Sequence, residues 1–296
     1  MSPELLIAIL SGLGGMFGWG IADFLAKKTI TTLGDVTTLF WCQFLGIFPL
    51  LALFLSAPSI PHIGYLELIW LAVLGIWSGL SYIPTYVAFG KGKVSLLSPL
   101  FACYAVVVTI LSAILLHEAI PLGRQIAFGV VFFGVLLISG DSKSILMLVG
   151  IARVKSEKVK GFKEILLAIC LYSTWLIALD QLVNGKDWAP LLLIIRVFSA
   201  ISLFGYAKAT KRRLRVVDSA LWKYLIFIGC FDVAAFACVS FGFSRTPFVS
   251  IVAMLSGAFS LPTIVLARIF LKERTTTVQT VGSLIVVVGV MLLAVL

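Results

Sequence analysis

Two charged side chains lie well inside long apolar segments of this sequence. Asp232 is midway along residues 219–243, and Arg196 is about a third of the way into residues 188–208. A charge at the bilayer centre costs at least about 2.5–3.5 kcal/mol on insertion scales, so each one needs a function or a partner. Asp232 could bind a substrate amine or carry a proton, or it could fix helix packing through an ion pair. Arg196 could clamp a carboxylate bidentately, but we favour an ion pair with Asp180 or Asp232.

Other carboxylates lie near the ends of apolar segments, where a charge costs less. Asp23 and Asp180 are therefore expected to have capping or interfacial roles. Glu118 and Glu273 directly follow apolar runs, each beside a basic or titratable neighbour. We expect these two glutamates to anchor the ends of spans.

Aromatic side chains accompany the charges. Most rings in such segments pack against neighbours or lie at the membrane interface, so ring type alone does not identify a cavity. We look first where Tyr82 and Tyr86 accompany Pro84, and where Phe241 follows Asp232. The predicted substrate-binding or coupling residues are Asp232, Trp77, Tyr82, Tyr86, Trp19, Trp175, Arg196 and Phe241.

Patterns typical of enzymes and metal sites are absent from the sequence. It contains no P-loop, no H-E-x-x-H and no G-x-S-x-G, and its two histidines are His62 and His117. Its five cysteines form no C-x-x-C pair. We therefore expect no metal, no cofactor and no enzymatic activity.

The composition shows which elements position these residues. Hydrophobic residues make up 61% of the 296 residues and charged residues 12%, against roughly 45–50% and about 25% in soluble domains. Runs of about 20 apolar residues predict transmembrane helices. The predicted fold class is an all-α integral membrane protein with ten helices, at residues 5–26, 36–56, 66–90, 94–116, 123–140, 164–183, 188–208, 219–243, 248–271 and 278–296.

Basic residues are unevenly divided between the two sides of this predicted bundle. Nineteen of the 23 lysines and arginines fall on the side opposite the termini, three fall on the side of the termini, and Arg196 lies within a span. The positive-inside rule then predicts a plasma-membrane protein with both termini extracytoplasmic. Lys91 and Lys93 would mark the cytoplasmic edge, with a gate over the cavity mouth as the alternative. The net charge of +10 requires no nucleic acid, and we interpret residues 208–215 as a signal for topology and anionic lipids.

The second half of the sequence repeats the first. At an offset of 155 residues, Val94-Ser95 matches Val249-Ser250, Glu118 matches Glu273 and Gly134-Val135 matches Gly289-Val290. Five spans per half would make the copies enter the membrane from opposite sides, an inverted repeat. The predicted domains are a first repeat at 1–141, a basic cytoplasmic linker at 142–162 and a second repeat at 163–296.

The sequence resembles the drug/metabolite transporter superfamily, in the form with two EamA domains. The resemblance covers nearly the whole chain. Its most specific element is residues 270–274, Phe-Leu-Lys-Glu-Arg, followed by Gly282 and Gly289-Val290. The other residues that carry it are Trp19-Gly20, Trp175, Arg196, His117-Glu118 and Gly134-Val135. The first copy lacks a basic residue after Glu118 and has Ala127 where the second has Gly282.

This resemblance implies a ten-helix secondary transporter that often exports amino acids or other small metabolites. One alternative is a flippase for a lipid-linked intermediate, which would have a wide lateral opening lined by Arg and Lys. The other is a sugar or nucleobase uptake carrier of the same fold. A closed, aromatic-lined central cavity with one or two carboxylates would favour solute transport. The sequence does not determine the oligomeric state.

Overall fold

The computed structural model describes residues 2–55, 63–115, 121–139, 159–183, 188–246 and 248–296. His117 and Glu118 lie outside these residues, as does most of the predicted linker. Helices account for most of the described chain, and it contains no strand. The helices are α1 (Pro3–Leu33), α2 (Asp35–Leu45), α3 (Ile47–Leu55), α4 (Tyr65–Lys91), α5 (Val94–Ala102), α6 (Tyr104–Leu115), α7 (Leu122–Ser139), α9 (Phe162–Val183), α10 (Trp188–Ala209), α11 (Ser219–Arg245), α12 (Val249–Gly257), α13 (Ser260–Phe270) and α14 (Thr277–Val295).

Eight segments in the described chain are long and apolar enough to cross a membrane. Apolar stretches in α7 and α14 are shorter, at Leu122–Ile138 and Thr277–Leu293. The structure thus confirms an all-helical protein with multiple apolar helices. The count of ten membrane crossings and their inverted topology stay predictions.

Three of the predicted spans are broken helices. The second divides at Gly46 into α2 and α3, the fourth at Cys103 into α5 and α6, and the ninth at Ala258–Phe259 into α12 and α13. Irregular backbone at membrane depth is tolerated where it is buried in protein or lines a cavity. The breaks therefore indicate where a polar site would lie.

The first helix extends further than the predicted span 5–26, because α1 continues to Leu33. Lys27 and Lys28 lie within it and do not end it. The Lys27 ammonium donates hydrogen bonds to the carbonyl oxygens of Phe89 and Gly92 at 2.5 and 2.7 Å. With these partners the charge is tolerated inside the bundle, and the helix continues past it.

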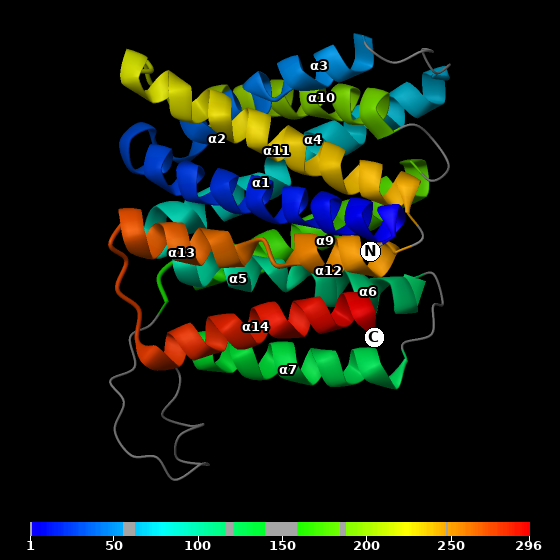
Figure 1. Ribbon diagram of the computed structural model, residues 1–296. Coiled ribbons are helices and arrows are strands. Elements are labelled where there is room, and N and C mark those ends of the chain that lie inside the picture. The colour runs from blue at the N-terminus through cyan, green and yellow to red at the C-terminus, as the bar shows by residue number, and fades with distance from the viewer. Residues whose placement is uncertain (1, 56–62, 116–120, 140–158, 184–187, 247) are drawn as a thin grey trace.

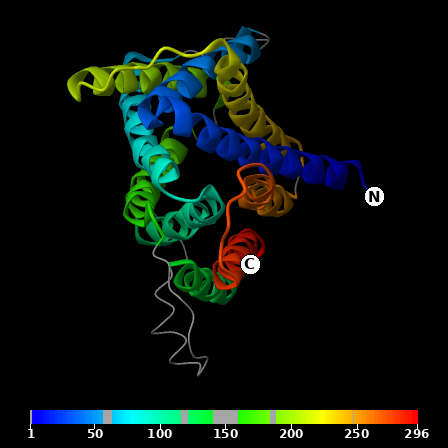
Figure 2. The same cartoon turned by 90° about the vertical axis from the view of Figure 1, so that its left-hand side faces the viewer.

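The helices run side by side, with α1 between α11 on one side and α12 and α13 on the other (Figure 1). Close approach depends on glycine. A Cβ at Gly18 would lie 2.8 Å from the carbonyl oxygen of Phe231 in α11, and one at Gly20 would lie 2.5 Å from that of Phe259. In a view along the bundle, α7 and α14 pair at one edge (Figure 2). We name the end that holds both chain termini the terminal end, and the opposite end, where α1 finishes, the Leu33 end (Figure 1).

Candidate functional site

A polar cavity of about 80 Å³ lies in the middle of the bundle. Residues beside all three helix breaks contribute to its lining, among them Gln43, Phe101 and Phe259. The breaks and the cavity thus coincide, as expected for a site formed by discontinuous helices. The full lining is Trp19, Ala22, Asp23, Cys42, Gln43, Tyr82, Thr85, Tyr86, Phe101, Tyr104, Tyr172, Arg196, Ile228, Gly229, Asp232 and Phe259.

Arg196 is at the centre of a hydrogen-bonded network in this cavity. Its guanidinium donates to the side-chain oxygen of Gln43 in α2 and to the carboxylate of Asp232 in α11. Arg196 is 8% exposed. Glycines make room for the network: a Cβ at Gly46 would lie 3.6 Å from the guanidinium, and Gly229 faces the backbone of Gly46. The sequence predicted an ion pair of Arg196 with Asp180 or Asp232, and in the structure Arg196 pairs with Asp232.

Asp23 is a second carboxyl in the cavity, and the sequence interpretation placed it near a span end. Its side chain accepts a hydrogen bond of 2.7 Å from the hydroxyl of Ser98 in α5. No basic side chain pairs with Asp23 within the described ranges. Asp232 is neutralised by Arg196, so Asp23 is the carboxyl that faces the cavity without a counter-ion.

Aromatic rings form much of the cavity wall. Tyr172 contacts Tyr82, Phe101 and Tyr104, with ring centroids 5.4, 5.3 and 4.9 Å apart. Tyr82 is thus part of a cluster that joins α4, α5, α6 and α9. Such rings can bind an apolar group or, through their faces, a cation.

A larger and mostly apolar cavity of about 740 Å³ adjoins the polar one. The two share Trp19, Tyr104, Tyr172 and Phe259 in their linings. Most of the other lining residues of the large cavity come from the halves of α9, α10, α11 and α14 that are nearer the terminal end, and the rest come from α6, α12 and the last residue of α5. The polar site thus adjoins an apolar space on the terminal side.

Five of the eight predicted site residues lie together in the polar cavity: Trp19, Tyr82, Tyr86, Arg196 and Asp232. The other three lie elsewhere. Trp175 is 2% exposed and its indole N–H donates to the carbonyl of Leu74 at 2.9 Å, a packing role. Trp77 packs against the main core. Phe241 is 51% exposed on the outer surface, below the guanidinium of Arg245.

The prediction missed Asp23, Gln43 and Tyr172 as cavity residues. Asp23 was missed because span 5–26 ended too early, which placed the carboxyl near a membrane surface. The repeat does carry a signal for Gln43, because Gln43 is the first-half counterpart of Arg196. Tyr172 has no such signal. Within the described chain, no three His, Cys, Asp or Glu side chains gather as metal ligands would.

Comparison with known proteins agrees with this architecture. The profile of the EamA-like transporter family matches twice, at residues 6–140 and 160–295. The chain belongs to the EamA-like transporter family. It is therefore a multi-pass membrane transporter of the drug/metabolite type, and the resemblance read from residues 270–274 is confirmed.

Solved structures with the same fold exist for this EamA-like protein. One, titled "Crystal structure of protein", covers 96% of this chain and 95% of its own, with a TM-score of 0.61 and 14% sequence identity. At that identity the match shows the fold alone. No curated protein sequence matches.

Proposed function

We propose that this EamA-like protein is a secondary carrier that exports small polar metabolites, amino acids being the leading class, by alternating access between its two halves. The observation that carries the proposal is the aromatic-lined cavity with the Arg196–Asp232 pair and the unpaired carboxyl of Asp23. Family membership supports transport in general. The cavity supports the substrate class.

The two cavities together suggest the shape of the substrate. Ligand pockets usually measure about 300–1,000 Å³, so a cavity of about 80 Å³ holds only a small polar group. The adjoining cavity of about 740 Å³ could hold an apolar body. We infer a substrate with a compact charged head and an apolar side chain.

The polar head would bind through complementary charges. An ammonium group would lie at Asp23, among the faces of Trp19 and Tyr86. A carboxylate would approach Arg196, whose planar guanidinium has five N–H donors and uses two of them on Gln43 and Asp232. A zwitterionic amino acid satisfies both ends.

The flippase alternative is less well supported. Its expected lateral opening would be lined by several arginines and lysines, whereas Arg196 is the one basic residue in the lining of the polar cavity. Arg196 is also already paired with Asp232. The aromatic lining and the two carboxylates of the polar cavity, Asp23 and Asp232, support a solute carrier.

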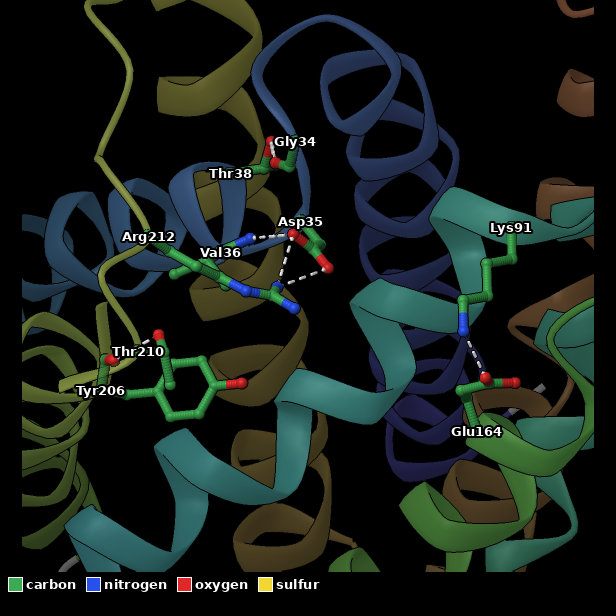
Figure 3. A network of polar contacts seen from close by, with 9 residues as sticks. All are labelled: Gly34, Asp35, Val36, Thr38, Lys91, Glu164, Tyr206, Thr210 and Arg212. Carbon is green, nitrogen blue, oxygen red and sulfur yellow. Dashed lines mark hydrogen bonds and ion pairs between the residues drawn. The ribbon is translucent and has the colours of Figure 1, made fainter. Parts of the chain in front are cut away.

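At the Leu33 end we further propose contacts with anionic lipids in a plasma membrane whose cytoplasm lies on that side. A hollow of about 460 Å³ after α10 is lined by Lys208, Lys211, Arg212 and Arg213. Arg212 also pairs with Asp35 at 3.1 Å, and Lys91 pairs with Glu164 across the same end of the bundle (Figure 3). Basic clusters beside a membrane attract anionic headgroups.

Counterflow into proteoliposomes tests the substrate class. We would load unlabelled leucine or phenylalanine and follow uptake of the labelled amino acid, with and without a pH gradient. Wild-type protein should show saturable uptake above empty liposomes. Asp23→Asn should reduce it at least tenfold and remove its response to pH, because the variant cannot take a proton or neutralise an ammonium.

Two controls make the result interpretable. Ser244→Ala changes an exposed hydroxyl of α11 and should transport like wild type, since it lies outside both cavities. Thermal unfolding of each variant reports whether it is folded. Uptake no better than empty liposomes for every amino acid tried would remove amino acids as substrates and redirect the search to sugars and nucleobases.

A further inference from the structure

The short connection between α4 and α5 brings two helix ends together. Residues 89–95, which we name the elbow, contain the last turn of α4 and the first residues of α5. The C-terminus of a helix leaves carbonyl oxygens without partners, and the N-terminus leaves amide hydrogens. The two ends also carry partial charges of opposite sign. The first residues of α5 receive no side-chain cap from the preceding Lys93.

A cation from α1 binds the carbonyl end of the elbow. The ammonium of Lys27 donates to the carbonyl oxygens of Phe89 and Gly92 at 2.5 and 2.7 Å. Its charge has the sign that a helix C-terminus attracts. Lys27 therefore holds the end of α4 against α1.

A carboxylate from the α13–α14 connection binds the amide end. Glu273 accepts hydrogen bonds from the backbone N–H groups of Val94 and Ser95, both at 3.0 Å, and from the Ser95 hydroxyl at 2.6 Å. Lys272, with φ of +53°, turns the chain after α13, and the Glu273 amide returns to the carbonyl of Ala267 at 3.3 Å. This turn presents the carboxylate to α5.

The same face of α1 connects these contacts to the polar cavity. Asp23 is one turn before Lys27, so both side chains project from one side of the helix. Asp23 lines the cavity and accepts from Ser98, which is three residues after Ser95 in α5. Behind them, Phe89, Val94 and Leu97 are completely buried. The elbow thus separates the cavity from the Leu33 end.

We propose that Lys27 and Glu273 are gating residues: together they hold the elbow against α1 and the α13–α14 connection, and both contacts must release before the cavity opens toward the Leu33 end. This inference rests on the alternating access proposed above. It does not depend on which solute is carried. We name the Lys27 and Glu273 contacts with the elbow the clasp. The clasp closes the path from the polar cavity to the Leu33 end, and the large apolar cavity lies on the terminal side.

Cys42 provides a natural reporter, because it lines the polar cavity and is buried. In a background with Cys103, Cys170, Cys230 and Cys238 replaced by alanine, we would add a membrane-impermeant methanethiosulfonate to vesicles of either orientation. Mass spectrometry of the Cys42 peptide would give the labelling rate from each end. An added cysteine at the exposed Arg213 would identify the Leu33 end.

Removing the charge of Lys27 or of Glu273 should open the path from the polar cavity to the Leu33 end. Glu273→Gln and Lys27→Met should each raise the Cys42 labelling rate from the Leu33 end at least fivefold and lower the rate from the terminal end. Lys27→Arg keeps a cation and donors, so it should restore protection. Glu164→Gln breaks the more exposed Lys91–Glu164 contact and should change either rate less than twofold.

Unchanged labelling from the Leu33 end in both folded variants would overturn the proposal. Equal increases from both ends would do so too, because they indicate general loosening and not release of a gate. Folding is checked by gel filtration and thermal unfolding, and Lys27→Arg separates a gating role from a merely structural one. A labelling shift without amino-acid counterflow would leave the clasp standing and refute the proposed substrate class alone.

Discussion

The two ends of the bundle are held together differently. At the Leu33 end, charged side chains from α1 and the α13–α14 connection bind backbone groups at the two helix ends of the elbow, and fully buried apolar side chains pack beside them. Toward the terminal end, an apolar cavity of about 740 Å³ is lined mainly by α6, α9, α10, α11, α12 and α14. Directional polar contacts therefore hold the Leu33 end together, whereas an apolar cavity lies toward the terminal end.

This difference bears on how such a carrier works. Hydrogen bonds to helix ends have defined partners and directions, so they form or break as units. Apolar surfaces can slide and repack with less directional constraint. An end closed by a few directional contacts suits a gate, and an apolar vestibule suits the passage of a partly apolar solute.

The largest loss of stability is expected on breaking the Arg196–Asp232 pair, which lies between the two ends of the bundle. Asp232→Asn removes the counter-ion of Arg196, which is almost fully buried. Breaking a buried pair from one side costs about 3–5 kcal/mol, so the apparent unfolding temperature in detergent should fall strongly. The matched variant Asp35→Asn breaks the more exposed pair with Arg212 and should cost at most about 1 kcal/mol. Equal losses in the two variants would contradict the central role of Arg196–Asp232.

The second-largest loss of stability is expected from a steric change at the elbow. A Cβ at Gly92 would lie 2.0 Å from the backbone carbonyl oxygen of Lys160, so Gly92→Ala must displace one of them. Overpacking of this kind costs roughly 1–3 kcal/mol. Gly90→Ala meets only the side chain of Ile30, at 3.2 Å, and serves as the control. We expect Gly92→Ala, but not Gly90→Ala, to lower the unfolding temperature and to raise the labelling rate of Cys42 from the Leu33 end. A fully stable Gly92→Ala would show that the elbow is loosely held.

Much of this arrangement was predictable, and the exceptions have physical causes. Long apolar runs predict the helices directly. The cost of buried charge drew attention to Arg196 and Asp232, which pair in the polar cavity. The end of α1 was misplaced because Lys27 looks like an interfacial charge until its carbonyl partners from a distant helix are known. Ring type does not reveal which way a side chain points, so Phe241 was grouped with residues that face the cavity. These are effects of tertiary packing that a local pattern does not contain.

Removing the hydroxyl beside the unpaired carboxyl should have a smaller effect. Ser98→Ala takes away the hydrogen-bond donor of Asp23, and an unsatisfied buried polar group costs about 1–3 kcal/mol. The cavity supplies room for a water to compensate, so we expect a loss near 1 kcal/mol. Ser98→Thr keeps the hydroxyl and serves as the comparison. Counterflow at several pH values should change in Ser98→Ala, while a variant with wild-type pH dependence would argue against coupling through Asp23.

The smallest effect is expected at the outer contact of the Leu33 end. Lys91 and Glu164 lie 2.5 Å apart, but their side chains are 54% and 27% exposed. Exposed pairs typically contribute about 0–1 kcal/mol. Glu164→Gln should shift the unfolding temperature barely at all, and any shift should shrink further at 0.5 M salt because exposed charges are screened. A loss comparable to that of Gly92→Ala would mean that Lys91 belongs to the clasp.

The alternation of the two ends can be measured most directly with spin labels. In a background free of native cysteines, one pair would occupy Lys160 and Arg274 across the clasp, and a second pair would occupy Leu115 and Phe248 at the terminal end. All four positions are exposed. Double electron–electron resonance in nanodiscs would compare the wild-type clasp with Glu273→Gln. We predict that the variant lengthens the first distance and shortens the second. Unchanged distances, or a change at the Leu33 end alone, would contradict the account.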